Sequence, residues 1–238
     1  MNHCSLLEKR GIMELQSQLT HLSSYTSKIL RKKFGRGPVS CQANLSGKYV
    51  FIYIRGFLSP MEEVMLEQDQ TKQVRYARNV VIHQVLEELT GVVQVTLDVE
   101  VAEYYHDWNF PDNTGMLLFV LENEINQTAI QVPWDLGALE KEVSRISFIV
   151  EKEPDLTKVS PITQNTVIVL REGIFIPIEK ALIAKGFIDE LRYTKDELEK
   201  RHLHQSSVFK EIFKRDVLDI FVDWNMKDDR SFIGFVMK

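Results

Sequence analysis

The spacing of apolar residues near the N-terminus predicts a long amphipathic helix. Apolar positions recur at steps of three and four through residues 5–34, so they share one helical face. Gly35 is expected to end this helix, and Ser23-Ser24 is a candidate break within it. The heptad-like spacing lasts under three heptads, which is short for a coiled coil.

Two strands and a second helix are expected next. Residues 39–45 are a plausible first strand, and the nearly continuous apolar run 49–54 predicts a strand inside a sheet. Ser59-Pro60 then places an N-cap residue before a proline at the first helical position, a pattern that initiates helices. This helix is expected to run to about Leu89, with a candidate interruption near Asp69-Gln70.

A hairpin completes the pattern. Thr90-Gly91 is expected to stop the helix, and residues 92–105 alternate apolar with polar, which predicts a half-buried strand. Residues 106–115 are rich in turn-forming residues, and residues 116–121 are expected to return as the second strand. The order is therefore helix-strand-strand-helix-strand-strand.

The chain contains this unit twice. Gly56, Pro60 and Glu62 recur 117 positions later as Gly173, Pro177 and Glu179 (173−56, 177−60, 179−62), and Asp107-Trp108-Asn109 recurs as Asp223-Trp224-Asn225 at 116 (223−107). An ordered series at a fixed offset indicates duplication. We therefore predict an α+β protein of two tandem copies, residues 1–124 and a degenerate 125–238, related by a pseudo-twofold.

The second copy is expected to follow the first. Residues 123–133 are interpreted as a connector. A capping box at Thr194-Lys195-Asp196-Glu197 is expected to restart a broken second helix. The remaining expected elements are a helix over 134–150, strands over 157–161 and 166–170, a helix from Pro177, and strands over 217–222 and 232–237.

Composition places the chain among ordinary soluble proteins. It has 238 residues, 44% of them hydrophobic and 26% charged, with a net charge of −5. The negative charge makes nucleic acid an unlikely partner for the surface as a whole. Two cysteines, Cys4 and Cys41, favour a reducing compartment. We find neither a run of about 20 apolar residues nor a signal-peptide pattern, so a cytoplasmic location, at most peripheral to a membrane, is expected.

Two groups of cations are candidate binding residues. Equivalent helices carry Arg75, Arg78, Arg192 and Lys195, which could converge on an anionic ligand in a cleft between the copies. The competing interpretation is an exposed helix face paired with Glu67, Asp189 or Glu190. The end of the first helix carries Lys28, Arg31, Lys32, Lys33 and Arg36, a candidate contact for phosphate or an anionic membrane, or a solvated group that stabilises the helix dipole.

Signals for catalysis are weak. Among the six histidines, only His202 and His204 are close in sequence, and their spacing suits a shared metal poorly. Cys41 is expected to be buried and inert. The residues around Asp107-Trp108 could perform acid–base chemistry, but their repetition favours a structural turn. We expect no cofactor, no metal and no catalytic residues.

At Gly35-Arg36-Gly37-Pro38, Gly56-Phe57-Leu58-Ser59-Pro60-Met61-Glu62 and Thr90-Gly91-Val92-Val93, the chain resembles the MpsC-like family. This is a soluble bacterial domain named for a sodium-translocating, membrane-potential-generating system. Ser59 stands where the family pattern has threonine, and the second copy lacks the GRGP segment. The resemblance implies association with a membrane ion or inorganic-carbon transport system, and it carries over no catalytic residues.

The sequence therefore favours a non-enzymatic accessory or regulatory protein with a protein partner, such as a membrane transport complex. The alternative is a sensor or enzyme that binds a small anion in the cleft between the copies, so enzymatic activity stays an open question. A third hypothesis, a phosphate-backbone binder using the basic end of the first helix, would show binding that weakens steeply with salt. The sequence does not indicate the oligomeric state.

Overall fold

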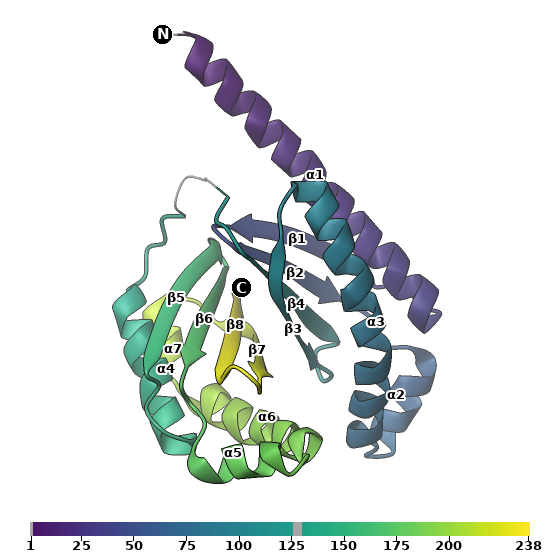
Figure 1. Cartoon of the computed structure of the whole chain (residues 1–238), viewed down its shortest axis with the longest axis vertical. Coiled ribbons are helices and arrows are strands. Elements are labelled where there is room, and N and C mark those ends of the chain that lie inside the picture. The colour runs from purple at the N-terminus through teal and green to yellow at the C-terminus, as the bar shows by residue number, and fades with distance from the viewer. Residues whose placement is uncertain (1, 126–129) are drawn as a thin grey trace. The chain divides into compact units, whose positions relative to one another are not determined.

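The computed structural model describes residues 2–125 and 130–238, with side chains from residue 13 onward in the first range (Figure 1). The middle of the predicted connector and the side chains of His3, Cys4 and Ile12 lie outside this description. The chain divides into two compact units. Unit 1 comprises Met1–Tyr104 and Asn113–Asn126, and unit 2 comprises Tyr105–Asp112 and Gln127–Lys238.

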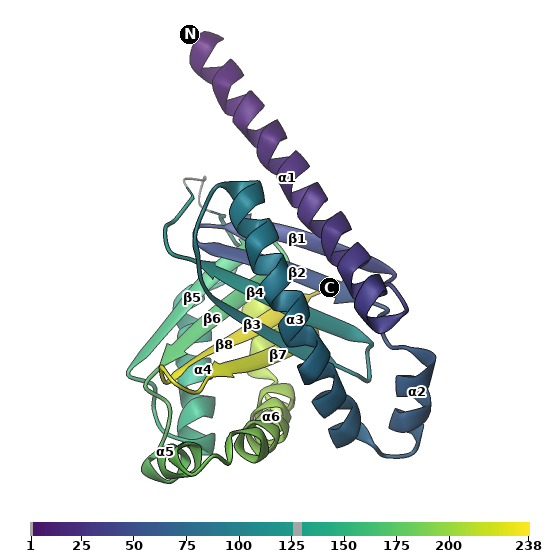
Figure 2. The same ribbon diagram turned by 45° about the vertical axis from the view of Figure 1, so that its right-hand side comes forward.

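Most of unit 1 is a four-stranded antiparallel sheet with helices packed against it. In chain order the elements are α1 (Asn2–Phe34), β1 (Ser40–Ser46), β2 (Tyr49–Arg55), α2 (Pro60–Glu67), α3 (Thr71–Leu97), β3 (Val101–Asn109) and β4 (Thr114–Leu121). Strand β3 pairs in this sheet, but its residues from Tyr105 onward are grouped with unit 2. The strand order is β1-β2-β4-β3, and α1 packs against β1 and α3 (Figures 1 and 2).

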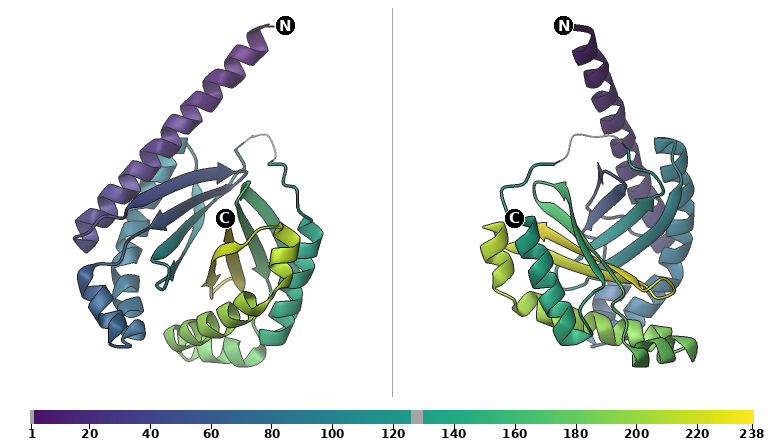
Figure 3. Two further views of the ribbon diagram at one scale, coloured as in Figure 1. Left: turned by 180° about the vertical axis from the view of Figure 1, so that it is seen from behind. Right: turned by 60° about the vertical axis from the view of Figure 1, so that its left-hand side comes forward.

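Unit 2 repeats this order. Its elements are α4 (Leu136–Val150), β5 (Leu156–Thr163), β6 (Thr166–Glu172), α5 (Pro177–Ala184), α6 (Ile188–Gln205), α7 (Val208–Phe213), β7 (Val217–Asn225) and β8 (Arg230–Met237). The strand order is β5-β6-β8-β7, and α4 and α6 pack against each other and against β5 and β7 respectively (Figure 3). The predicted α+β fold is confirmed, and α7 is an addition to the repeated order.

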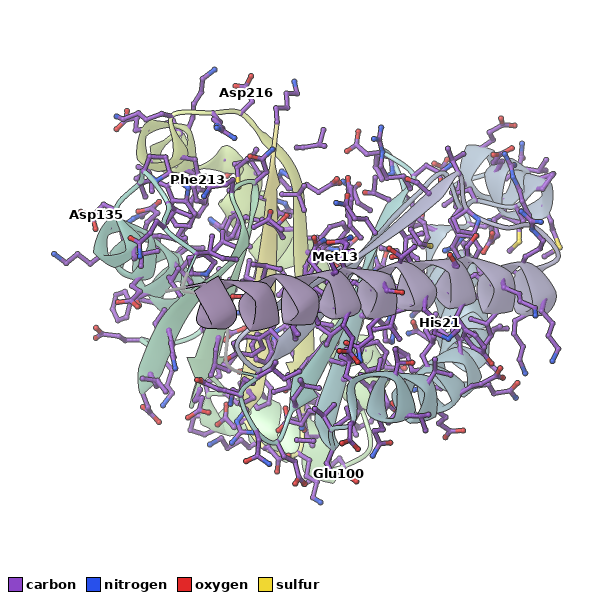
Figure 4. The ribbon with its side chains drawn as sticks, turned by 90° about the horizontal axis from the view of Figure 1, so that it is seen from above. Met13, His21, Glu100, Asp135, Phe213 and Asp216 are labelled. Carbon is purple, nitrogen blue, oxygen red and sulfur yellow. The ribbon has the colours of Figure 1, made fainter. Side chains whose placement is uncertain are left out.

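Aromatic rings pack against one another in the core of unit 2. The N-cap residue Asp135 accepts a hydrogen bond from the Ala138 N–H at 3.1 Å and starts α4 just after Trp134. The Trp134 ring meets the Phe213 ring edge to face, with 5.1 Å between the ring centroids. Figure 4 marks Asp135 and Phe213 in this part of unit 2. Burial of such large rings supplies much of the apolar stabilisation of the unit.

The turn before the short helix is built in the same way in both units. Gly56 and Gly173 have φ of 66° and 67°, a conformation that favours glycine. The side-chain oxygen of Asn113 accepts hydrogen bonds from the next two backbone N–H groups, at 2.6 and 2.8 Å. In unit 2 the Asp229 carboxylate does the same, at 2.8 and 2.9 Å. The hairpin turn thus anchors the start of the helix.

The prediction of a strand over residues 92–105 is wrong at its start, because α3 continues to Leu97. The alternation there is compatible with a helix, since Leu89, Val93 and Leu97 are four apart and all buried. Gly91 is exposed and does not end the helix. The helix ends instead at Asp98, whose φ of 54° is left-handed. The interruption near Asp69-Gln70 is confirmed, with Asp69 at φ 58° between α2 and α3.

Three other local predictions are wrong. Helix α1 is continuous through Ser23, whose hydroxyl donates to the Leu19 carbonyl at 2.8 Å and accepts from the Ala43 N–H of β1 at 2.9 Å. Helix α6 begins at Ile188, so Thr194 lies inside it and donates to the Glu190 carbonyl at 2.8 Å. Residues 106–109 belong to β3, and the turn is confined to the residues between β3 and β4.

Candidate functional site

The turn into α2 forms a capping box. Ser59 precedes Pro60, the first residue of α2. The Ser59 hydroxyl accepts from the Glu62 N–H at 3.4 Å, and the Glu62 carboxylate accepts from the Ser59 N–H at 2.8 Å. The box satisfies backbone donors that a helix start leaves unpaired. It also holds the Glu62 carboxylate at a fixed place.

Arg78 of α3 meets this carboxylate inside unit 1. Its Nε donates to Glu62 Oε1 at 2.7 Å, and its second amino group donates to Glu62 Oε2 at 3.0 Å and to the Phe57 carbonyl at 2.9 Å. The side chains of Arg78 and Glu62 are 2% and 9% exposed. The guanidinium carbon lies 5.5 Å from the centroid of the Phe34 ring and 4.8 Å from that of Phe57.

The environment explains the ionisation of this pair. Burial alone would raise the pKa of Glu62, but the hydrogen bonds and charge of Arg78 outweigh burial and lower that pKa. Burial lowers the pKa of Arg78, and Glu62 opposes the change. Arginine stays charged in proteins, so the pair is a buried bidentate salt bridge.

Unit 2 places Lys195 and Glu179 at the matching positions. Lys195 Nζ lies 2.8 Å from Glu179 Oε1, and the other Glu179 oxygen accepts from the Ile176 N–H at 2.9 Å. The lysine nitrogen lies 5.0 Å from the centroid of the Phe175 ring and 5.6 Å from that of Trp224. Ile176 has no side-chain oxygen, so only the glutamate half of the capping box remains.

Further charges surround Lys195. Its ammonium group also bonds to Glu151 and lies 3.5 Å from Glu199. Arg171 of β6 donates to Glu199 at 2.6 Å, to the Ser147 hydroxyl at 2.9 Å and to the Ser231 hydroxyl at 2.8 Å. The Trp224 indole N–H donates to Glu199 at 3.1 Å. We call Glu151, Arg171, Glu179, Lys195 and Glu199 the charged core of unit 2.

Burial governs the ionisation here as well. Burial raises the pKa of Glu179, and the nearby Glu199 and Asp229 carboxylates add to the increase. Burial lowers the pKa of Lys195, although Glu199 and Asp229 oppose that change. Both directions favour the neutral forms, in contrast with the ionised Glu62 of unit 1.

The other two predicted anion-binding residues are placed differently. Arg75 is half-buried on α3. Arg192 of α6 is ion-paired with Asp223 and donates to the Trp224 carbonyl at 2.9 Å. For Arg78 and Lys195, the geometry favours a structural role, because carboxylates of their own unit already face both charges. Anion binding by these four residues stays a prediction.

The cations at the end of α1 are accessible. Lys28, Arg31 and Lys32 are exposed and Lys33 is half-buried. Lys33 Nζ lies 3.3 Å from the Gln84 side-chain oxygen. Arg36, also exposed, donates to the Leu58 carbonyl at 3.0 Å and lies 3.4 Å from Glu63 of α2. The basic end of α1 therefore adjoins the start of α2.

The repeated Asp-Trp-Asn segments lie side by side within unit 2. Asp107 accepts hydrogen bonds from the Trp108 and Val222 N–H groups at 2.7 and 2.8 Å. Asp223 accepts from the His106 and Trp224 N–H groups, both at 2.8 Å. The carboxylates thus bind strand backbone, which favours the structural interpretation over the acid–base one. The prediction that these residues form a turn is wrong, because they belong to β3 and β7.

Metal and thiol chemistry find little support in the described part of the chain. No group of three or more His, Cys, Asp or Glu side chains suited to a metal occurs among the described residues. Cys41 of β1 is half-buried rather than buried, and burial raises the pKa of its thiol to about 12. A thiol with that pKa is protonated near neutral pH and is a weak nucleophile.

Within residues 2–125 and 130–238, one helix meets the length and composition of a membrane span. This helix is α3, which is long and apolar enough to cross a bilayer by length and composition alone. It also buries Arg78 and seven apolar side chains in unit 1: Val74, Ile82, Val85, Leu86, Leu89, Val93 and Leu97. A core helix of a soluble domain passes the same test, so this finding is weak support for a span.

Sequence reasoning located part of this site. The repeat identifies Glu62 and Glu179 as equivalent positions, and the sequence places their partners Arg78 and Lys195 at a candidate anion site. The pairing itself could have been found, because a carboxylate and a cation 16 positions later (78−62, 195−179) recur in both copies. Glu151, Arg171 and Glu199 carry no such signal, since the first copy has no charge at the matching positions.

The fold and the site define the class: a duplicated α+β domain, each copy holding a buried carboxylate–cation pair at the start of its short helix. The chain belongs to the family described as "Na+-translocating membrane potential-generating system (MpsC)", which matches residues 15–123 and 139–238. The predicted family and its tandem duplication are confirmed. No curated protein and no solved structure matches the chain significantly.

Proposed function

We propose that this chain is a non-enzymatic accessory protein of a membrane ion-transport system, held at the membrane surface by the basic end of α1. The observation that carries the proposal is the accessibility of Lys28, Arg31, Lys32 and Arg36 on a chain whose net charge is −5. The family description, which names a Na+-translocating membrane-potential-generating system, supports the same setting.

The surface beside these cations also exposes apolar side chains, as peripheral membrane contacts do. The adjoining helix α2 exposes Met61 and Val64, which are 68% and 59% exposed. Arg36 joins α1 to α2 through its contacts with Leu58 and Glu63. Cations attract anionic headgroups, and neighbouring apolar side chains enter the interface. The rest of the chain is acidic, so attraction is confined to this region.

The test is cosedimentation of the full chain with vesicles of phosphatidylglycerol and phosphatidylcholine, compared with phosphatidylcholine alone. Each cation near an anionic surface contributes about 1 kcal/mol. Replacing Lys28, Arg31 and Lys32 with alanine should therefore weaken binding to the anionic vesicles about 100-fold. Binding should also fall as the ionic strength rises, because salt screens exposed charges.

A matched control removes three exposed cations of unit 2, Lys141, Lys158 and Lys227, and should leave binding unchanged. Equal binding to both kinds of vesicle, or binding to neither, would contradict docking of the basic end of α1 on anionic lipid. Capture experiments with solubilised membranes, using the same variants, would then ask whether the basic end of α1 contacts a protein of the transport system.

A further inference from the structure

The charged core of unit 2 is buried on every side. The exposed fractions of the two cationic side chains are 1% for Arg171 and 4% for Lys195. Those of the carboxylates are 2% for Glu151, 8% for Glu179 and 2% for Glu199. They come from α6, from β6, from α5 and from the residue that follows α4. Charged groups withdrawn from water this completely need compensation from within the protein.

The charges in this core do not balance. Two cations, Arg171 and Lys195, face three carboxylates, so the fully ionised group carries one excess negative charge. The next charges outward, Lys180 of α5 and Asp229 in the β7–β8 turn, form their own ion pair at 2.9 Å and cancel. Trp224 of β7 and Ser147 and Ser231 contribute hydrogen bonds but no charge.

One oxygen in this core has nothing to compensate it. Glu151 Oε2 is buried and has no hydrogen-bond partner among the described residues, whereas Glu151 Oε1 contacts Lys195. Both oxygens of Glu179 and of Glu199 accept hydrogen bonds. An uncompensated buried carboxylate oxygen is costly, and protonation removes its charge.

The first copy has apolar residues at the positions of three of these charged side chains. Glu151, Arg171 and Glu199 correspond to Phe34, Ile54 and Ile82 at the same offset of 117 (151−34, 171−54, 199−82). Unit 1 therefore keeps only the balanced pair of Arg78 and Glu62. The second copy has two carboxylates and one cation at positions that are apolar in the first.

We propose that the charged core of unit 2 is a proton-binding site, in which Glu151 and Glu179, the two carboxylates that share Lys195, together hold one proton. The proton comes from solvent and changes the net charge of the five side chains from −1 to 0. Folded unit 2 therefore binds one proton that its unfolded chain releases near neutral pH, and the stability of unit 2 responds to pH. This property does not depend on the docking of unit 1.

The direction of the response follows from linkage. A carboxyl whose pKa is higher in the folded chain stabilises the fold fully below its unfolded value of about 4.3, and this contribution is lost as the pH rises through the folded value. The lowered pKa of Lys195 acts in the opposite sense, because stability rises with pH between its folded and unfolded values. The informative window for the carboxyl therefore begins above its unfolded value of about 4.3 and extends through neutral pH.

Urea unfolding of the full chain, followed by tryptophan fluorescence, measures this response. Trp134 and Trp224 belong to unit 2, but Trp108 lies on β3 in the sheet of unit 1, so the measurement is made in a Trp108→Phe background and then reports unit 2. The unfolding constant should rise with pH, by up to about tenfold per pH unit for one proton. Glu151→Gln and Glu179→Gln, which remove a titrating group and keep an acceptor oxygen, should flatten the slope. Glu62→Gln in unit 1 is the matched control and should retain it.

Two results would overturn the proposal. One is a flat or falling unfolding constant across this window. The other is a wild-type slope that persists in both Glu151→Gln and Glu179→Gln. The series should also be repeated in sodium chloride and in choline chloride, to test whether a sodium ion binds in place of the proton. A pH slope that sodium abolishes and choline does not would assign the site to a metal cation and contradict proton binding.

A second measurement needs no variant. In the full chain labelled with carbon-13 at glutamate carboxyls, one carboxyl resonance should titrate well above the ordinary value of about 4.3. Titration of every glutamate near or below that value would refute the proposal even if both variants failed to fold.

Discussion

The two units place a carboxylate and a cation at the same point of the same fold, and they surround them differently. Unit 1 encloses the pair of Glu62 and Arg78 between the rings of Phe34 and Phe57. Unit 2 encloses Glu179 and Lys195 among further charges. The comparison teaches that the same fold accommodates either an apolar or an ionic layer at this point, provided that the buried charges are paired with one another.

There is a physical reason why Arg171 and Glu199 occur together. Arg171 alone would be a buried cation without a partner, and Glu199 alone a buried anion. Together they form a salt bridge at 2.6 Å, with Ser147 and Ser231 as added acceptors for Arg171. The positions that they occupy correspond to Ile54 and Ile82, two buried apolar side chains in unit 1.

The largest expected effect comes from breaking this salt bridge on one side only. Glu199→Ile leaves Arg171 buried and unpaired, and it should destabilise unit 2 by about 3–5 kcal/mol. The double change Arg171→Ile with Glu199→Ile restores the residues of unit 1 and should recover most of that loss. Urea unfolding followed by tryptophan fluorescence measures both. A double variant as unstable as the sum of the single ones would refute the comparison.

Exchanging the central cation should have a smaller effect. Arg78→Lys gives unit 1 the cation of unit 2, but lysine cannot reach both Glu62 oxygens and the Phe57 carbonyl in a planar fork. The lost contacts should cost about 1–3 kcal/mol. Hydrogen exchange of the β2 and β4 amides reports this change within unit 1 itself, whereas Trp134 and Trp224 report unit 2. Unchanged protection would show that the bidentate geometry is dispensable.

Substitutions at the two helix caps are expected to change the stability of the two units in opposite directions, each by about 1 kcal/mol or less. Ser59→Ala removes the hydroxyl of the capping box and should destabilise α2 by about 1 kcal/mol. Ile176→Ser adds the missing hydroxyl before α5 and should stabilise unit 2 by about 0.5–1 kcal/mol. Amide exchange in the first turn of each helix is the measurement. Destabilisation by Ile176→Ser would show that the half-buried isoleucine contributes more through packing than a cap would.

The smallest effect at moderate pH is expected for the carboxylate of unit 1. Because the pKa of Glu62 is lowered in the folded chain, its contribution is complete above the unfolded value of about 4.3 and is lost as the pH falls through the folded value. Protection of the unit 1 amides should therefore decrease in acid, and Glu62→Gln should reduce that dependence. The sign is opposite to that expected for unit 2, and equal signs in the two units would contradict the comparison.

Much of the fold could be predicted from local signals. Ser59-Pro60 and its repeat near Pro177 marked the starts of α2 and α5, because capping and proline chemistry act within a few residues. The end of α3 could not be found in this way. The residues from Val92 to Leu97 satisfy both periods, and only burial of Val93 and Leu97 decides in favour of a helix.

The candidate site was likewise predictable only in part from the sequence. By itself the sequence determined the family, the duplication and the spacing of the carboxylate and the cation, because these are relations between positions along the chain. Only the tertiary structure decided that Arg78 and Lys195 point at carboxylates within their own unit, and that Glu151, Arg171 and Glu199 join Lys195. The reason is that burial and charge pairing depend on which side chains meet in space, and residues as distant as Glu151 and Lys195 meet only once the strands and helices have packed.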